Sequence, residues 1–171
     1  MLDDDIVEAG KKLLDICKRK NLLIATAESC TAGLVSGTLT DIPGVSSMLD
    51  RGFITYSNQA KREMLGVSGE TLDRHGAVSK ETAQEMARGA LKNAPVDLAV
   101  SLTGIAGPDG GSEEKPVGLV HFAAASREGQ FVHVEKRFGA IGRAEVRKRS
   151  VLQAFRMLHD LAEREATKPP R

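Results

Sequence analysis

A serine and a cysteine that follow a short apolar run form the first segment with chemical potential. Residues 27–33 read AESCTAG, and residues 22–26 before them have the composition of a buried strand. A hydroxyl or thiol at a strand-to-helix turn can act as a nucleophile, and backbone N–H groups at a helix start can stabilise an oxyanion. Alternatively, Ser29 or Thr31 caps a helix that begins near Thr31, which is the commoner use of these residues. Cys30 could then be a small buried residue.

A lysine and the chain's single tyrosine form the second segment. Residues 52–56 read GFITY, which is typical of a strand, and residues 57–65 read SNQAKREML, which is typical of a short capped helix. A lysine near a serine can act as a general base if burial or nearby charge lowers its pKa. Taken alone, the pattern favours the alternative, in which Lys61 lies on a solvated helix face and Tyr56 packs on the sheet.

A glycine-rich loop between two apolar runs is the third segment. Residues 103–111 read TGIAGPDGG, and KPVG follows at 115–118. Glycines let a backbone approach a ligand closely, although the loop matches neither the P-loop pattern nor the GxGxxG fingerprint. Its length and its place between two strands favour a functional loop over a floppy surface connection.

Basic residues open the last helix, where they would suit a phosphate or form a solvated face. They are Arg143, Arg147, Lys148 and Arg149. The histidines are dispersed without an HExxH motif, and Cys17 and Cys30 lie far from any CxxC spacing. We therefore expect no metal site and no cofactor, and ordinary packing or surface roles for His75, His121, His133 and His159.

Strands alternate with helices along the chain until a final hairpin. Helical patterns are predicted over 3–20, from about Thr31, over 57–65 and 80–94, and from about Arg143. Strands are predicted at 22–26, 52–56, 96–104, 117–126 and 130–138, and the glycine-containing stretch 66–76 is expected to be a connector. This order predicts an α/β fold, a three-layer α/β/α sandwich on a mixed, mostly parallel sheet of about five strands, one of them antiparallel. Residues 1–171 are expected to form one domain.

The overall composition is that of an ordinary soluble globular chain. The 171 residues include 24 Lys and Arg against 23 Asp and Glu, so a net charge of +1 gives no general attraction to nucleic acid or to a membrane. No apolar run approaches the roughly 20 residues that span a bilayer, and the acidic start MLDDDIVEAGKK does not resemble a signal peptide. We expect a cytoplasmic protein with reduced cysteines.

The three segments together resemble the C-terminal domain family of the competence-damage-inducible protein CinA. The matching stretches are TAESCTAG, GFITYSNQAKREMLGV, GAVSKETAQEMA and SLTGIAGPDGGSEEKPVGLVHFA. The family includes stand-alone nicotinamide-nucleotide amidohydrolases. The resemblance therefore implies an α/β/α enzyme that converts nicotinamide mononucleotide and water to nicotinic acid mononucleotide and ammonia. The longer CinA proteins carry an additional N-terminal domain, for which 171 residues leave no room. We therefore do not expect the activities of that domain here.

The resemblance also implies roles for individual residues. Ser29 corresponds to the family's nucleophile, and Lys61 and Tyr56 correspond to its other catalytic residues. The nucleotide is expected at the glycine-rich loop and the arginines of the last helix, that is, at Thr103, Gly104, Ala106, Gly107, Gly110, Gly111, Arg143 and Arg147. The N–H groups near Cys30 and Thr31 are expected to hold the oxyanion of the reacting amide. The family commonly has GDR at the start of the last helix, where this chain has Ile141, Gly142 and Arg143. The chain therefore lacks the acid that precedes this arginine in the family.

A second function from another class stays open at this level. The domain could be a non-catalytic module that binds a partner in DNA uptake or repair, as the family's name suggests. A chain that had lost the serine and the lysine would favour that role, whereas this chain keeps both. The expected partner is thus a small nucleotide substrate, without nucleic acid or membrane, and homo-oligomer formation is left open.

Overall fold

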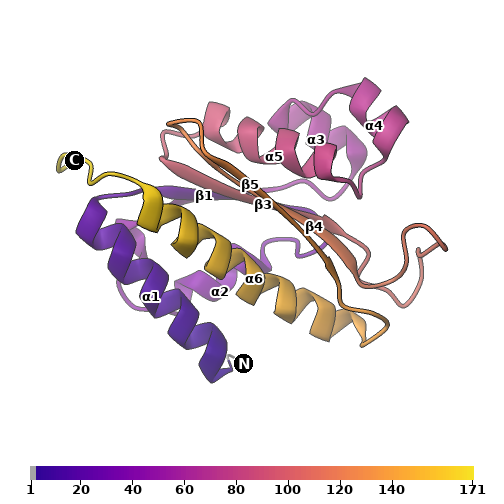
Figure 1. Cartoon of the computed structure of the whole chain (residues 1–171), viewed down its shortest axis with the longest axis horizontal. Coiled ribbons are helices and arrows are strands. Elements are labelled where there is room, and N and C mark those ends of the chain that lie inside the picture. The colour runs from indigo at the N-terminus through magenta and orange to yellow at the C-terminus, as the bar shows by residue number, and fades with distance from the viewer. Residues whose placement is uncertain (1–2) are drawn as a thin grey trace.

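A five-stranded sheet between two layers of helices makes up the computed structural model, which describes residues 3–171 (Figure 1). The strands are β1 (Ile24–Glu28), β2 (Leu49–Ile54), β3 (Leu98–Gly104), β4 (Leu119–Ser126) and β5 (Phe131–Arg137). The helices are α1 (Asp4–Lys20), α2 (Leu34–Thr40), the 3-10 turn η1 (Val45–Ser47), α3 (Asn58–Leu65), α4 (Gly69–His75), α5 (Lys80–Asn93) and α6 (Arg143–Arg164).

The sheet is mixed, with the strand order β2-β1-β3-β4-β5. The strand β1 pairs in parallel with β2 and β3, while β4 is antiparallel to both β3 and β5. One strand therefore runs against the other four, and the predicted α/β class and sheet are confirmed. Within residues 3–171, no helix combines the length and the apolar character that crossing a membrane requires.

The two faces of the sheet are covered by different helices and different side chains. Helices α1, α2 and α6 cover one face, where bulky residues such as Leu98, Val100 and Leu102 form the larger core. Helices α3, α4 and α5 cover the other face (Figure 1), where the strands present mostly alanines. The strands β1, β3 and β4 are thus buried on both faces, as their apolar composition predicts.

Several predicted boundaries differ from the structure, among them that of the strand predicted at 22–26, which is β1 at Ile24–Glu28. The expected connector at 66–76 contains the helix α4, because the side chain of Ser68 caps it by accepting a hydrogen bond from the N–H of Thr71. The helix expected from Thr31 begins only at Leu34, since Gly33 adopts a left-handed conformation with φ of 95°. The strand predicted at 52–56 is the edge strand β2, which begins at Leu49 and ends at Ile54.

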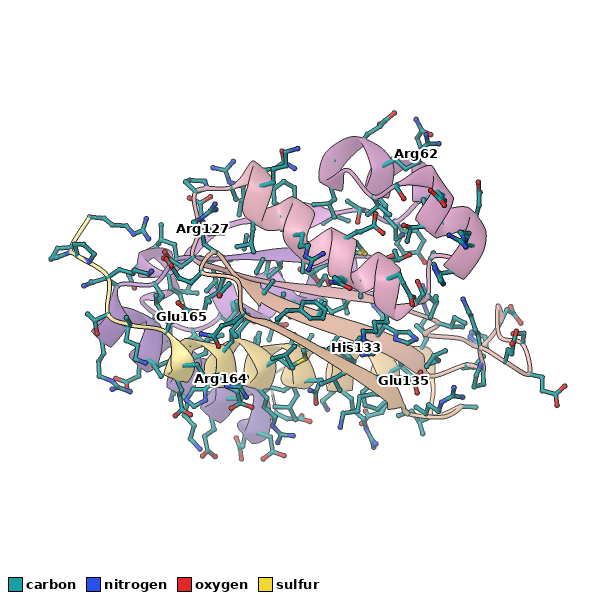
Figure 2. All side chains as sticks on the ribbon, turned by 45° about the horizontal axis from the view of Figure 1, so that its top comes forward. Arg62, Arg127, His133, Glu135, Arg164 and Glu165 are labelled. Atoms are coloured by element: carbon teal, nitrogen blue, oxygen red, sulfur yellow. The ribbon has the colours of Figure 1, made fainter. Side chains whose placement is uncertain are left out.

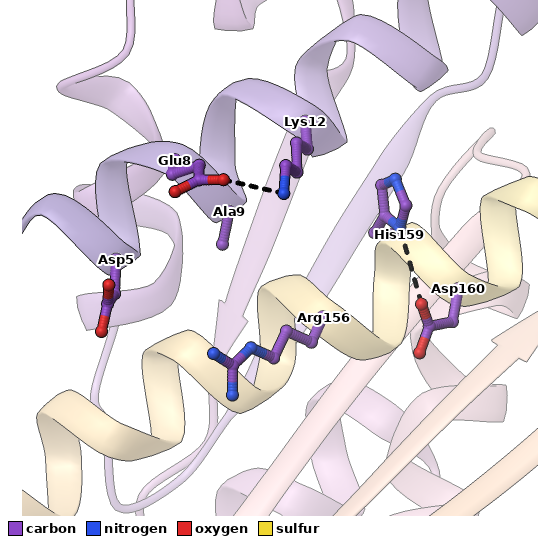
Figure 3. A pocket seen from close by; sticks show the side chains of 7 residues that line it. All are labelled: Asp5, Glu8, Ala9, Lys12, Arg156, His159 and Asp160. Carbon is purple, nitrogen blue, oxygen red and sulfur yellow. Dashed lines mark ion pairs between the residues drawn. The ribbon is translucent and has the colours of Figure 1, made fainter.

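A shallow groove between α1 and α6 is lined mainly by charged side chains (Figure 3). Within it, Lys12 pairs with Glu8 at 2.8 Å. Its histidine, His159, forms with Asp160 and Glu163 the one group of three potential metal ligands that lie close together within residues 3–171. The two acids are largely exposed, and the groove contains none of the site residues expected from the sequence.

Two of the histidines that are dispersed in the sequence meet on neighbouring strands. Nδ1 of His121 lies 2.9 Å from Nε2 of His133, with the rings stacked, and Figure 2 shows His133 beside Glu135 on β5. Burial lowers the pKa of both rings below the usual histidine range. The pair therefore stays neutral in the folded protein at neutral pH, while the unfolded chain takes up protons more readily.

We predict that this pair makes the fold less stable in mild acid. Because the folded-state pKa values are lowered, the stabilisation is complete above the ordinary pKa of about 6.5 and is lost as the pH falls below it. The melting temperature of the wild type should fall between pH 7.5 and 5.5, and the double variant His121→Gln/His133→Gln should show a smaller fall. Equal slopes in the two proteins would contradict the prediction, and His159→Gln is the control.

Candidate active site

The turn after β1 brings Ser29 to the carboxyl end of the sheet. Its N–H donates to the carbonyl of Leu102 on β3 at 3.1 Å, and its carbonyl accepts from the N–H of Ala32 at 3.0 Å. Ala32 has a positive φ of 47°, so the chain reverses tightly before α2 begins. The serine side chain is buried, and its position is fixed by backbone contacts on both sides.

The side chain of Lys61 reaches this serine from α3. Ser57 caps that helix by accepting from the N–H of Ala60 at 3.0 Å, so the helix begins at Asn58. Lys61 lies on the buried side of this helix. Nζ of Lys61 lies 3.0 Å from Oγ of Ser29. It also lies 3.0 Å from the carbonyl oxygen of Thr55 and 3.2 Å from that of Tyr56.

Lys61 is among the most buried residues of the protein, with 1% of its surface exposed. The alternative of a solvated helix face is therefore wrong. Burial lowers the pKa of Lys61 from the ordinary lysine value, because desolvation disfavours the ammonium. The serine hydroxyl thus faces an amine that releases its proton more easily than a surface lysine does.

The neighbouring thiol of Cys30 is held in its unreactive, protonated form. Cys30 is buried, and burial raises its pKa to about 11. A thiol with such a pKa is protonated at neutral pH, and the thiolate is the nucleophilic form. Of the two adjacent candidates, Ser29 is therefore the one with both a base in contact and a suitable environment.

A cavity of 270 Å³ lies beside the serine and the lysine. Its walls are formed by residues at the ends of β1, β2 and β3, in the glycine loop and at the start of α6. The residues expected from the sequence that line it are Ser29, Cys30, Tyr56, Lys61, Thr103, Gly104, Ala106, Gly107, Gly110 and Arg143. Ten of the expected residues, from four segments far apart in the sequence, thus share one cavity, as ligand sites at the carboxyl ends of strands in open α/β sheets do.

Sequence reasoning missed some lining residues, which are Asn58, Ala77, Val78, Ile105 and Asp109. Ala77 and Val78 belong to the matching stretch GAVSKETAQEMA, so the resemblance could have indicated them. The hydroxyl of Thr103 donates to the carbonyl of Ala77 at 2.7 Å, and this bond fixes the α4–α5 connection against β3.

Three expected residues do not line the cavity. The hydroxyl of Thr31 points away from it and donates to Glu28 at 2.7 Å. Gly111 lies against the backbone of Val117, where a Cβ would collide, so this glycine packs the loop. Arg147 donates to the carbonyl of Thr31 at 3.1 Å and so contacts the serine turn.

Arg143 connects three parts of the site. Its guanidinium donates to the carbonyl of Gly107 at 2.9 Å and to the hydroxyl of Tyr56 at 3.0 Å. Tyr56 is 60% exposed, so this contact lies at the mouth of the cavity. Gly107 has a φ of 85° and leaves no room for a Cβ beside Val117, which explains a glycine where the loop turns toward the arginine.

The fold and the site together define an α/β enzyme whose cavity is lined by a serine in contact with a buried lysine. The sequence model of the CinA C-terminal domain family matches residues 7–162, and the chain belongs to this family. A curated relative, the nicotinamide-nucleotide amidohydrolase PncC of Escherichia coli strain K12, is 47% identical over 158 residues, which cover 92% of this chain and 95% of the relative.

Other relatives carry the name that describes competence and damage induction. A putative competence-damage inducible protein of Acetivibrio thermocellus is 51% identical over 150 residues, which cover 88% of this chain but only 35% of that longer relative. The crystal structure of competence/damage inducible protein CihA from Agrobacterium tumefaciens has a TM-score of 0.93 and 51% identity, with 94% of this chain and 98% of that chain covered.

Proposed function

We propose that this protein hydrolyses the carboxamide of nicotinamide mononucleotide, releasing nicotinic acid mononucleotide and ammonia. The observation that carries the proposal is the contact of 3.0 Å between the buried Nζ of Lys61 and Oγ of Ser29. The relatives named as nicotinamide-nucleotide amidohydrolases, which align over nearly their whole length, support the substrate. A module that only binds a partner would gain nothing from burying a lysine against a serine, because a buried charge is costly.

The surroundings of Lys61 favour its action as the base. Backbone carbonyls only accept hydrogen bonds, so those of Thr55 and Tyr56 engage both N–H groups of a neutral amine. The lone pair of Nζ is then directed at Ser29, whose hydroxyl donates to it. Proton transfer from Ser29 to Lys61 turns the hydroxyl into the nucleophile that an unreactive amide requires.

The reaction then follows the usual course of acyl transfer to serine. Oγ of Ser29 attacks the carboxamide carbon, and the N–H groups of Cys30 and Thr31 stabilise the negative oxygen of the tetrahedral intermediate. Ammonia leaves after taking a proton from Lys61, or from Tyr56 with Lys61 then returning its proton to Tyr56, so Lys61 is neutral again in either case. Water, deprotonated by Lys61, hydrolyses the resulting ester, and nicotinic acid mononucleotide leaves with Ser29 restored.

The direct test is an assay of ammonia release from nicotinamide mononucleotide by the purified protein. We expect catalytic turnover by the wild type, with nicotinic acid mononucleotide formed in equal amount. No release by a protein that melts cooperatively would overturn the proposed function.

The phosphate of the substrate is predicted to lie near Arg143. This arginine lines the cavity at its mouth, whereas Arg147 does not line it. A charge-assisted contact of this kind is worth roughly 1.5–3 kcal/mol, so its loss should cost about tenfold or more in kcat/KM. Arg143→Ala should therefore narrow the preference for the mononucleotide over nicotinamide riboside.

The matched control for this prediction is Arg147→Ala. Because Arg147 does not line the cavity and its guanidinium donates to the carbonyl of Thr31 in the serine turn, its loss should lower kcat/KM for both substrates by the same factor. The measurement is the ratio of kcat/KM for mononucleotide and riboside in the three proteins. An unchanged ratio in Arg143→Ala would mean that the phosphate is bound elsewhere.

A further inference from the structure

A carboxylate that the sequence analysis did not single out lies directly behind the serine turn. Glu28 is the last residue of β1 and is 1% exposed. Burying a carboxylate is costly unless hydrogen bonds replace its water, so such a residue needs partners. Glu28 has four, and they come from three different segments.

One oxygen of this carboxylate binds the turn and the helix after it. Oε1 of Glu28 accepts from the hydroxyl of Thr31 at 2.7 Å and from the N–H of Val35 at 2.8 Å. The other oxygen binds the helix and the strand, because Oε2 accepts from the N–H of Ser36 at 3.1 Å and from the hydroxyl of Thr26 at 3.1 Å.

These bonds decide which N–H groups remain for a substrate. The first turn of a helix normally offers free N–H groups to an anion. In α2, Glu28 occupies those of Val35 and Ser36. Within residues 3–171, by contrast, no backbone carbonyl accepts a hydrogen bond from the N–H groups of Cys30 and Thr31, which lie beside the nucleophile.

We propose that Glu28 is a positioning residue, which holds the turn of residues 29–33 so that Ser29 faces Lys61 while the Cys30 and Thr31 N–H groups stay free for the substrate's carbonyl oxygen. The identity of the substrate in this inference rests on the proposed function, whereas the hydrogen bonds of Glu28 do not depend on it. The carboxylate touches neither Ser29 nor Lys61, and it acts through the Thr31 hydroxyl and the start of α2.

The first variant is Glu28→Gln, which keeps the shape of the side chain. Because each carboxylate oxygen accepts from two donors, the NH₂ group of the glutamine faces two donors in either orientation. Small displacements of a nucleophile cost up to about 100-fold in rate. We expect kcat for ammonia release to fall about 10- to 100-fold, with KM for the mononucleotide within about threefold. The matched control is Glu165→Gln, which neutralises another buried carboxylate, bound to Gln130, outside the cavity.

The two threonines that donate to Glu28 provide a second comparison. Thr31→Val removes the bond to the turn, and Thr26→Val removes a bond to the strand together with the contact of 2.6 Å between the hydroxyls of Thr26 and Ser36. Each variant loses one hydroxyl. The proposal predicts that Thr31→Val lowers kcat by about fivefold or more and that Thr26→Val changes it less than threefold. Equal effects of the two variants, or normal kcat in folded Glu28→Gln, would overturn it.

A reagent that reacts with the serine itself separates this inference from the choice of substrate. The rate at which phenylmethylsulfonyl fluoride modifies Ser29 is measured by mass spectrometry in each variant, at a temperature well below its melting transition. We expect slower modification in Glu28→Gln and Thr31→Val than in Thr26→Val, even if nicotinamide mononucleotide is not hydrolysed. Wild-type rates in all variants would show that Glu28 only stabilises the fold, and failure of ammonia release alone would overturn only the substrate.

Discussion

Ser29→Ala is expected to reduce ammonia release from nicotinamide mononucleotide by about 10³-fold or more, whereas Cys30→Ala is expected to retain most of the activity. Removing a catalytic serine eliminates the covalent route, and only stabilisation by the remaining groups is left. The thiol, by contrast, is buried with a pKa raised to about 11, so it is protonated at neutral pH. The measurement is kcat for both variants with their melting temperatures.

The two variants serve as controls for each other, because each removes one small polar group from neighbouring buried positions. A fully active Ser29→Ala would exclude the serine mechanism. Loss of activity in Cys30→Ala with normal activity in Ser29→Ala would assign the nucleophile to the thiol instead.

The second large effect is expected at Lys61. Lys61→Met keeps an unbranched chain in a fully buried position but removes the base, so turnover should fall by about 10²- to 10⁴-fold. Lys61→Arg should also be nearly inactive, because arginine keeps its proton at any working pH. Lys92→Met, the same substitution at an exposed position on α5, is the control and should have normal activity.

The pH dependence provides an independent test of the same residue. The neutral amine is the active form, so kcat/KM should rise with pH and fall as the pH drops through the pKa of Lys61. Because burial lowers that pKa, the midpoint should lie below 10.5, the ordinary value for a lysine. A pH-independent rate from pH 6 to 10, or near-normal turnover in Lys61→Arg, would mean that Lys61 does not act as the base.

The order and type of most elements could be predicted from sequence patterns. Five strands and the long helices follow from apolar runs and helical periodicity, and the single antiparallel strand follows from the hairpin at the end of the sheet. The helix α4 was missed because glycines flank it and it has only seven residues, too few for a periodicity to show. Its capping serine, Ser68, was the available signal.

The site was less predictable because its geometry depends on contacts between distant segments. The burial of Lys61 depends on α3 packing against α5 and β2, and nothing in SNQAKREML distinguishes a buried lysine from a solvated one. For the same reason, patterns alone could not separate Arg143, which lines the cavity, from Arg147 one helical turn later. Glu28 was missed because a buried carboxylate in an apolar strand shows its partners only in three dimensions.

The alanines on the α5 side of the sheet have a consequence for how the protein tolerates mutation. They are Ala25, Ala27, Ala99, Ala123 and Ala125. With side chains this small between the strands and α5, a larger residue at any of these positions must move that helix outward, since a close-packed interior has no spare volume. Ala77 and Val78 come just before α5 and line the cavity. We therefore expect substitutions beneath α5, at residues that do not line the cavity, to alter the range of substrates.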